Sequence, residues 1–148
     1  METNKPHFLI VDDDPVVCEL LSAMLDSFGC EAEVLMSSRA AILMLDRPDA
    51  ASRFDGIFLD VVMPDTDGIQ VLSAIRRNSH TQELPVIMLT AMDTASIMMN
   101  SYQKGASYYM TKPFCSHQVV YGLDLVLSAS PEGKPLHRIH EIPEDFCQ

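Results

Sequence analysis

Short runs of apolar residues alternate along the chain with longer segments in which apolar residues recur every three or four positions. The short runs are typical of strands covered on both faces, and the longer segments are typical of helices with one apolar stripe. The strand-like runs are residues 7–12, 30–36, 54–60, 85–90 and 107–111. The helical segments are residues 15–28, 38–45, 67–77, 95–104 and 118–127, with a polar break at 47–52. Five strands interleaved with five helices predict an α/β fold with a mostly parallel sheet.

The length and composition of the chain fit one globular domain. It has 148 residues, of which 47% are hydrophobic, and this is enough to bury a core. Beyond residue 128 the composition turns to Ser, Pro, Gly and charged residues. We therefore expect a domain at 6–128 and a flexible tail, or the start of a linker, at 129–148. The sequence leaves open whether the chain stands alone or is part of a longer regulator.

The charge and the apolar runs argue against two classes of partner. A net charge of -11 argues against direct binding of nucleic acid, which requires a basic surface, and suits cations or basic partners. The longest apolar runs have four or five residues, so we expect no contact with a membrane. The cysteines, which have no CxxC spacing, are Cys18, Cys30, Cys115 and Cys147. Their simplest interpretation is thiols that pack in apolar segments, in a reducing cytoplasm.

The polar residues that end the strand-like runs are the candidates for chemistry. A mostly parallel sheet carries its sites at the carboxyl ends of its strands. The residues at the ends of the first, third, fourth and fifth runs are Asp12, Asp13, Asp60, Thr90 and Lys112. We therefore expect three acids, one hydroxyl and one ammonium at the same edge of the sheet.

The third consecutive acid after the first run, Asp14, has a simpler explanation. It precedes Pro15, and proline is favoured at the first position of a helix. An aspartate just before that position accepts a backbone N–H bond and stabilises the helix by about 1 kcal/mol. We therefore assign a capping role to Asp14 and no chemistry.

Three carboxylates that share one pocket are hard to keep ionised unless cations balance them. Lys112 supplies one positive charge, and a divalent ion would supply two more. Mg2+ usually takes one or two carboxylates together with phosphate oxygens. A magnesium ion, an ammonium and a hydroxyl around a carboxylate suit phosphoryl transfer, with the carboxylate as the nucleophile. A salt-bridged structural cluster is the alternative interpretation.

Four stretches of the chain resemble, in order and spacing, the receiver domain of two-component system response regulators. They are LIVDDDP, GIFLDVVMPDTDG, LPVIMLTAM and YYMTKPF. The resemblance covers about residues 6–127. It implies a flavodoxin-like, doubly wound (βα)5 fold, with a five-stranded parallel sheet in the strand order 2-1-3-4-5.

The resemblance implies a phosphoacceptor site that depends on magnesium. Asp60 would accept a phosphoryl group from a histidine of a sensor histidine kinase or of a histidine phosphotransfer protein. Asp13 and Asp60 would bind Mg2+, or Mn2+ in its place, through their carboxylates. Val62 would bind the ion through its backbone carbonyl, and Asp12 would hold it through water.

Further residues would contact the phosphoryl group, as the resemblance implies. Thr90 would donate a hydrogen bond to one phosphoryl oxygen, together with the Ala91 amide, and Lys112 would pair with another oxygen. Tyr109 occupies the position of the switch aromatic, which turns inward when Thr90 is drawn to the phosphate. The family also implies a cis peptide bond before Pro113, and X–Pro is the bond at which the cis form is least unfavourable.

The implied output is a change of surface. A phosphoryl group adds charge that biases a two-state element. The face formed by the fourth helix, the fifth strand and the fifth helix, within residues 92–104 and 108–127, would repack to control a partner or an output domain. The chain would catalyse only its own phosphorylation and dephosphorylation. The sequence identifies neither the kinase nor the downstream partner, and it leaves open a phosphorylation-linked homodimer.

Two positions depart from the commonest pattern of the family. Val62 and Met92, which lie two residues beyond Asp60 and Thr90, are both apolar. In this family these positions flank the route of the hydrolytic water. Apolar side chains neither orient water nor readily admit it, so we expect slow loss of the phosphoryl group.

Two other functions compete with this interpretation. A phosphatase of the haloacid dehalogenase type also uses a strand-end aspartate with Mg2+, a threonine and a lysine. It needs a second aspartate as acid and base where this chain has Val62, and the sequence has no cap-domain insertion. An interaction module that has lost phosphorylation is the third hypothesis, and the complete set of site residues argues against it.

Overall fold

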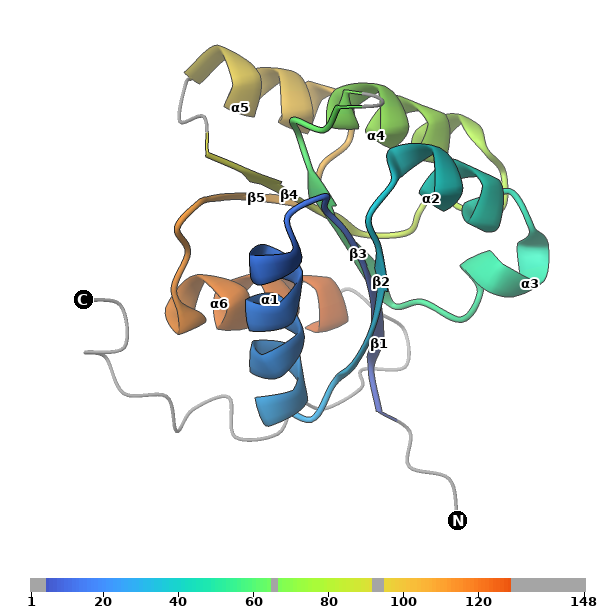
Figure 1. The fold of residues 1–148 in the computed structure, drawn as a ribbon. Helices are drawn as coiled ribbons and strands as arrows, with labels where there is room; N and C mark the ends of the chain where they lie inside the picture. The colour runs from blue at the N-terminus through green and yellow to red at the C-terminus, as the bar shows by residue number, and fades with distance from the viewer. Residues whose placement is uncertain (1–4, 65–66, 92–94, 129–148) are drawn as a thin grey trace.

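The computed structural model describes residues 5–64, 67–91 and 95–128 (Figure 1). The predicted tail at 129–148 and the apolar position Met92 lie outside the described residues. The domain boundary near residue 128 therefore stays a prediction.

A single parallel sheet runs through the middle of the molecule. Its strands are β1 (His7–Val11), β2 (Glu31–Leu35), β3 (Gly56–Asp60), β4 (Val86–Thr90) and β5 (Tyr108–Thr111). They pair in parallel in the order β2-β1-β3-β4-β5, which confirms the predicted fold class and strand order. Strand β3 is thus the central strand, and every residue of β3 and β4 is buried, as expected for parallel strands covered on both faces.

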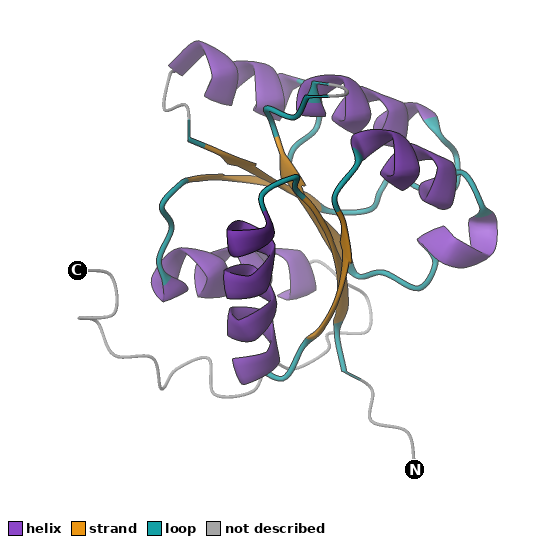
Figure 2. Ribbon diagram, viewed as in Figure 1, coloured by secondary structure: helices purple, strands orange, loops and turns teal. Residues whose placement is uncertain are grey.

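Helices cover both faces of the sheet. They are α1 (Pro15–Ser27), α2 (Ser38–Leu45), α3 (Pro48–Ala51), α4 (Gly68–Arg77), α5 (Ala95–Gln103) and α6 (Ser116–Ser128). Helices α1 and α6 lie on one face, whereas α2, α4 and α5 lie on the other (Figures 1 and 2). The sequence pattern predicted five of the six helices in the described part of the chain.

The short helix α3 is the difference from the prediction. It falls within residues 47–52, which the polar composition indicated as a break. A helix of four residues is too short to show a period, and only the proline at its first position is a helix signal. Because α3 intervenes, the fourth and fifth helices of the strand–helix repeat are α5 and α6.

The hydrophobic core has two halves, one on each face of the sheet. Successive residues of a strand point to opposite faces. Phe8 and Ile10 of β1 pack with residues of α1 and α6, whereas Leu9 and Val11 pack with residues of α2 and α4. All four side chains are fully buried, and burial of each contributes roughly 2 kcal/mol. Alternate side chains of the strands therefore pack against the helices on the two faces of the sheet.

The helix α1 begins and ends as its sequence predicts. The Asp14 side chain accepts a hydrogen bond of 3.0 Å from the Val16 N–H, and Pro15 is the first helical residue, which confirms the predicted cap. Gly29 follows the helix with a φ of 82°, a left-handed conformation that glycine adopts without strain. The chain can therefore turn directly from α1 into β2.

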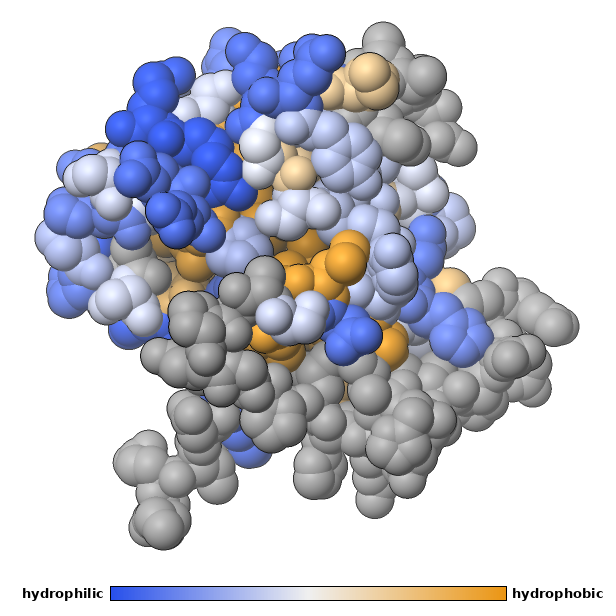
Figure 3. Space-filling model, turned by 180° about the vertical axis from the view of Figure 1, so that it is seen from behind, coloured by the Kyte–Doolittle hydropathy of each residue, from blue (hydrophilic) through white to orange (hydrophobic). Residues whose placement is uncertain are grey.

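The face of the molecule that is hidden in Figure 1 carries many hydrophilic side chains. Figure 3 shows the face opposite to that of Figure 1, with hydrophilic side chains around a small apolar area near the centre of the view. Within the described residues, no helix is both long enough and apolar enough to span a bilayer.

The cysteines match the expectation only in part. Cys18 and Cys30 are free and buried, and burial raises the pKa of the Cys18 thiol to about 11 and that of Cys30 to about 12. Both thiols are therefore packing residues rather than nucleophiles. Cys115 is disulfide-bonded, which the expectation of free thiols did not include.

Candidate functional site

The polar residues predicted at the strand ends meet at one edge of the sheet. Asp60 and Thr90 are the last residues of β3 and β4, while Asp12 and Lys112 directly follow β1 and β5. All the strand pairs are parallel, and Thr90 lies opposite Thr111, the last residue of β5. The carboxyl ends of four strands therefore converge, as the rule for parallel sheets predicts.

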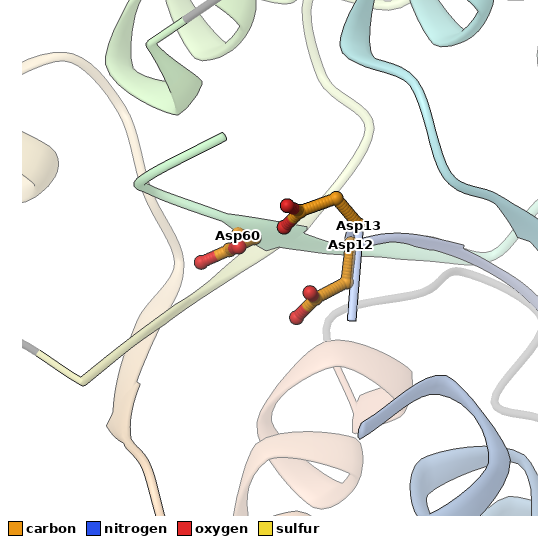
Figure 4. Close-up of side chains that lie close together, drawn as sticks. All are labelled: Asp12, Asp13 and Asp60. Carbon is orange, nitrogen blue, oxygen red and sulfur yellow. The ribbon is translucent and has the colours of Figure 1, made fainter. Parts of the chain in front are cut away.

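Three carboxylates form the centre of this site. Oxygen atoms of Asp12, Asp13 and Asp60 all lie within 4.8 Å of one another, and the side chains point into the space beyond the strand ends (Figure 4). Asp12 is fully buried and Asp60 is 4% exposed, whereas Asp13 is exposed to solvent. An ion could thus approach the two buried carboxylates from the side of Asp13.

An open cleft of about 510 Å³ surrounds the carboxylates. Its lining residues are Asp13, Asp14, Pro15, Asp60, Val62, Thr90, Ala91 and Lys112. Thr90, at the carboxyl end of β4, is fully buried, and Ala91, the next residue, is exposed. The cleft thus brings together residues from four segments that are far apart in the sequence.

Lys112 forms ion pairs with two of the three acids. Its Nζ atom lies 2.8 Å from Asp12 Oδ2 and 3.4 Å from Asp60 Oδ1. Burial acts to lower the pKa of Lys112, but its hydrogen bond with Asp12 and the charge of Asp60 raise that pKa overall. The ammonium therefore stays charged. It balances one of the three negative charges.

The Asp60 carboxyl group has an unusual affinity for protons. Burial and then the charge of Asp12 raise its pKa from 3.8 to about 7, against the opposing effects of Lys112 and of the Val62 N–H, which lies 3.4 Å from Oδ1. A carboxylate in this position needs a further cation to remain fully ionised near neutral pH. Carboxylate oxygens are hard ligands that suit a small divalent ion such as Mg2+, so the donor set fits the ion that the sequence predicted.

Tyr109 and Pro113 lie beside the cleft rather than in it. Tyr109, in β5, is 6% exposed and packs in the half of the core that faces α2 and α4. The aromatic ring that the resemblance assigns to the switch thus lies inward in this structure. The peptide bond between Lys112 and Pro113 is cis, which confirms the implication of the family resemblance.

Gly68 is a site-forming residue that the sequence interpretation missed. It is the first residue of α4, and its N–H donates a hydrogen bond of 2.7 Å to the Val61 carbonyl. A Cβ atom at this position would collide with the Asp60 carbonyl oxygen and would lie 2.8 Å from the Val61 Cα. The only sequence signal was the DG dipeptide that follows the acid-ending strand, which alone indicates a turn.

Comparisons with known proteins agree on one family. The family model of the response regulator receiver domain matches residues 8–123. The DNA-binding dual master transcriptional regulator RpaA of Synechocystis sp. is 33% identical over 111 residues, which cover 74% of this chain and 44% of that protein. Among solved structures, a putative response regulator from Chloroflexus aurantiacus is 30% identical with a TM-score of 0.77, over 84% of this chain and 99% of that chain.

A second solved structure bears on the metal. The receiver domain of the sensor histidine kinase PA1611 from Pseudomonas aeruginosa, which has a magnesium ion in its active site cleft, is 28% identical. Its TM-score is 0.71, over 81% of this chain and 95% of that chain. The matching proteins thus include receiver domains of both transcriptional regulators and histidine kinases.

The comparisons leave the function of any longer protein open. The chain spans about half the length of the transcriptional regulators that it matches. The DNA binding named for RpaA conflicts in part with the predicted absence of nucleic-acid binding, but this chain matches only the receiver part of such proteins. The sheet order, the acidic strand ends and the match over residues 8–123 agree. The chain belongs to the response regulator receiver domains of two-component systems, a family of signalling domains rather than typical enzymes.

Proposed function

We propose that the chain is a phosphorylation-activated switch in which Asp60 accepts a phosphoryl group from a histidine of a sensor kinase or of a phosphotransfer protein. An Asp60 carboxylate oxygen attacks the phosphorus of the phosphohistidine, the P–N bond breaks, and the leaving imidazole takes up a proton. The observation that carries the proposal is the position of Asp60, which is nearly buried between two further carboxylates and an ammonium at the carboxyl end of the central strand. That arrangement suits phosphoryl transfer.

The three acids would hold a magnesium ion during this transfer. Asp13 and Asp60 would bind the ion directly, the Val62 carbonyl would complete the protein ligands, and Asp12 would hold the ion through water. The ion would neutralise the charge that the phosphoryl group brings to the acidic cleft. Asp12 has a second role in this proposal, since its 2.8 Å contact with Lys112 keeps the ammonium beside Asp60.

Thr90, the Ala91 amide and Lys112 would hold the phosphoryl oxygens on the opposite side. All three line the cleft with Asp60. Hydrogen bonds and ion pairs that form only with the modified protein bias a two-state element. Recruitment of Thr90 would change the packing around Tyr109, and the change would reach α5 through Ala91.

The responding surface would be the face formed by α5, β5 and α6. The rings of Tyr108 and Tyr121 are in edge contact on this face, with 5.2 Å between their centroids. Tyr121 is 56% exposed, and Tyr102 of α5 is also exposed. We propose that this surface contacts the downstream partner or output domain, in the cytoplasm.

The phosphatase alternative is not favoured. A haloacid dehalogenase needs an acid two residues beyond its nucleophile for turnover, and that position is Val62. The family match to receiver domains points the same way.

The decisive experiment is mass spectrometry of the intact protein after incubation with acetyl phosphate and Mg2+. The wild type should gain the mass of one phosphoryl group, and the gain should vanish when Mg2+ is chelated. Asp60→Asn should gain nothing, whereas Asp124→Asn, which changes an exposed carboxylate on α6, should behave as the wild type. An unchanged wild-type mass, or an equal gain in Asp60→Asn, would contradict the proposal. Continued release of phosphate from a generic monoester would favour the phosphatase instead.

A further inference from the structure

Arg76, near the end of α4, makes contacts that the phosphoacceptor site does not explain. Its guanidinium donates hydrogen bonds to the Gly105 carbonyl from Nε at 3.0 Å and from Nη2 at 2.7 Å. Nη1 donates to the Leu84 carbonyl at 2.7 Å and lies 3.4 Å from the Thr81 carbonyl. One side chain thus joins three connections in the fold: the end of α4, the entry to β4 and the entry to β5.

The partners of Arg76 are backbone groups rather than acidic side chains. All its hydrogen-bond acceptors are backbone carbonyls, and none of the ion pairs among the described residues includes it. Burial lowers the pKa of Arg76, so the fold holds this cation at a cost that only these hydrogen bonds offset. The planar fork of a guanidinium can reach two separate carbonyls at once, which a lysine ammonium cannot do with the same geometry.

The backbone conformation of Gly105 and its lack of a side chain allow the guanidinium to approach closely. Its φ is 106°, in the left-handed region that favours glycine. A Cβ atom at Gly105 would lie 2.7 Å from Arg76 Nε, closer than real Cβ atoms approach other groups. The absence of a side chain at Gly105 is therefore what lets the fork reach its carbonyl.

The contact lies at the opposite edge of the sheet from the cleft. Leu84 and Gly105 precede β4 and β5, whose other ends carry Thr90 and Lys112. Gly105 also closes α5, because its N–H donates to the Tyr102 carbonyl at 3.0 Å. The carboxyl end of α5 is thus tied to α4 through Arg76, whereas its amino end follows the residues that line the cleft.

We propose that Arg76 is the pivot of the switch: it fixes the carboxyl end of α5, so that occupancy of the cleft moves the amino end of α5 and leaves the carboxyl end in place. The inference rests on the proposed function, since it concerns how the signal at Asp60 reaches α5. Helix α5 has nine residues and a length of about 13 Å, so it is short enough to move as a rigid body about a fixed carboxyl end. Arg76 is a positioning residue, because it touches none of the groups in the cleft.

Amide hydrogen exchange measured by NMR tests the pivot, with beryllofluoride and Mg2+ as the probe of the occupied state. The amides of Lys104, Gly105, Ala106 and Ser107 have hydrogen-bond partners in the structure, so their exchange reports on the carboxyl end of α5. In an α-helix the amides of residues 99–100 bond to the carbonyls of residues 95–96, so their exchange reports on the amino end of α5. In the wild type, beryllofluoride should change the rate of amide exchange at 99–100 by about fivefold or more, and at 104–107 by less than about twofold. Equal changes at both ends would overturn the proposal.

The variants Arg76→Gln and Arg76→Lys test whether the hydrogen bonds of the guanidinium hold the carboxyl end of α5 in place. Both should speed exchange at 104–107 about tenfold in the free protein, and in both the response to beryllofluoride should spread to 104–107. Arg77→Gln is the matched control, because it removes an exposed charge from the neighbouring position of the same helix and should behave as the wild type. A purely structural arginine would alter the free protein without changing which end of α5 responds to beryllofluoride, and that result would overturn the pivot.

Further comparisons distinguish a failure of the pivot from a folding defect and from a failure of the proposed function. Arg76→Lys keeps the charge, so a wild-type response in this variant would mean that the fork has no role and would overturn the proposal. If Arg76→Gln does not fold, Gly105→Ala disturbs the same contact from the other side and should give the same spread of response. Acceptance of a phosphoryl group is measured by mass for each protein. If the wild type gains no phosphoryl mass, the proposed function and the pivot are both overturned. If all the proteins gain that mass but α5 shows the same exchange response to beryllofluoride in each of them, only the pivot is overturned.

Discussion

At the scale of single residues, Asp60 carries a charge that the fold disfavours. Its pKa is raised to about 7 by burial and by Asp12, so the folded protein binds this proton more tightly than the unfolded chain. The free energy of unfolding should therefore fall as the pH rises from about 4 to about 7 in metal-free buffer. Asp60→Asn removes this titration and should be more stable than the wild type by about 2 kcal/mol above pH 7, with the gain lost at low pH.

Urea denaturation at several pH values without Mg2+ measures the effect of Asp60→Asn. Asp124→Asn is the control, because its carboxylate is exposed on α6 and should give no comparable gain. A stability difference that stays constant with pH would mean that Asp60 does not titrate in this range.

We predict that Val62 influences the lifetime of the phosphoryl group. Its side chain is 56% exposed and lines the cleft two residues beyond Asp60, so it faces the path by which water would enter. Val62→Asn introduces an amide that can orient a water molecule, and it should speed loss of the phosphoryl group about tenfold. The decay of phosphorylated protein after removal of the donor is the measurement, with the apolar change Val62→Leu as control. Unaltered decay in Val62→Asn would contradict the role of Val62.

The meeting of the candidate site residues at one edge of the sheet could be predicted because these residues follow the strand ends. A short run of apolar residues shows where a strand stops, and Asp12, Asp60 and Lys112 could be placed from that alone. The geometry between them could not be predicted, since it depends on rotamers and on neighbours in other strands. No residue pattern indicated that Lys112 Nζ lies nearer to Asp12 than to Asp60.

At the scale of elements, the junction of β3 and α4 fixes the Asp60 backbone. Gly68 leaves no room for a Cβ atom against the Asp60 carbonyl. Gly68→Ala should lower the free energy of unfolding by more than about 1 kcal/mol, although alanine favours helices, and it should slow phosphoryl acceptance. Ser73→Ala in the same helix is the control. Thermal unfolding and the rate of mass gain from acetyl phosphate are the two measurements, and wild-type values for both would refute the proposed contact.

Asp14, at the start of α1, can be tested for a capping role as opposed to a catalytic one. Asp14 lines the cleft, but its side chain bonds to the Val16 N–H. Asp14→Ala should lower stability by about 1 kcal/mol, whereas Asp14→Asn, which keeps a capping oxygen, should lose much less. Both variants should still accept a phosphoryl group. Loss of acceptance in Asp14→Asn would show that the charge, rather than the cap, is what this residue contributes.

The helices that the sequence predicted well are those with a long apolar stripe. Helix α1 could be bounded to within one residue, since Asp14, Pro15 and Gly29 mark its two ends. Helix α3 has no stripe, so nothing in the pattern distinguished it from a loop. The contact of Arg76 with Gly105 joins positions 29 residues apart, and no local pattern encodes a long-range bond from a side chain to a backbone carbonyl.

At the scale of the whole molecule, the acidic cleft adds to a net charge of -11. An ion that binds only the folded state stabilises it by mass action. Mg2+ at millimolar concentration should therefore raise the melting temperature of the wild type by more than NaCl of equal ionic strength. Asp13→Asn should remove this difference, because it deletes the exposed carboxylate of the cluster. A magnesium effect of the same size in Asp13→Asn would place the ion elsewhere on the acidic surface.

The central place of β3 has a consequence for how such a domain can diverge. Asp60 stands between β1, which supplies the acids, and β4 with β5, which supply the hydroxyl and the ammonium. In the proposed function, ion capture and signal readout would thus be delivered by opposite halves of one sheet and would share a single carboxylate. Changes on the readout half can retune partner choice while the ion-holding half stays as it is, so one molecular frame can serve many pathways.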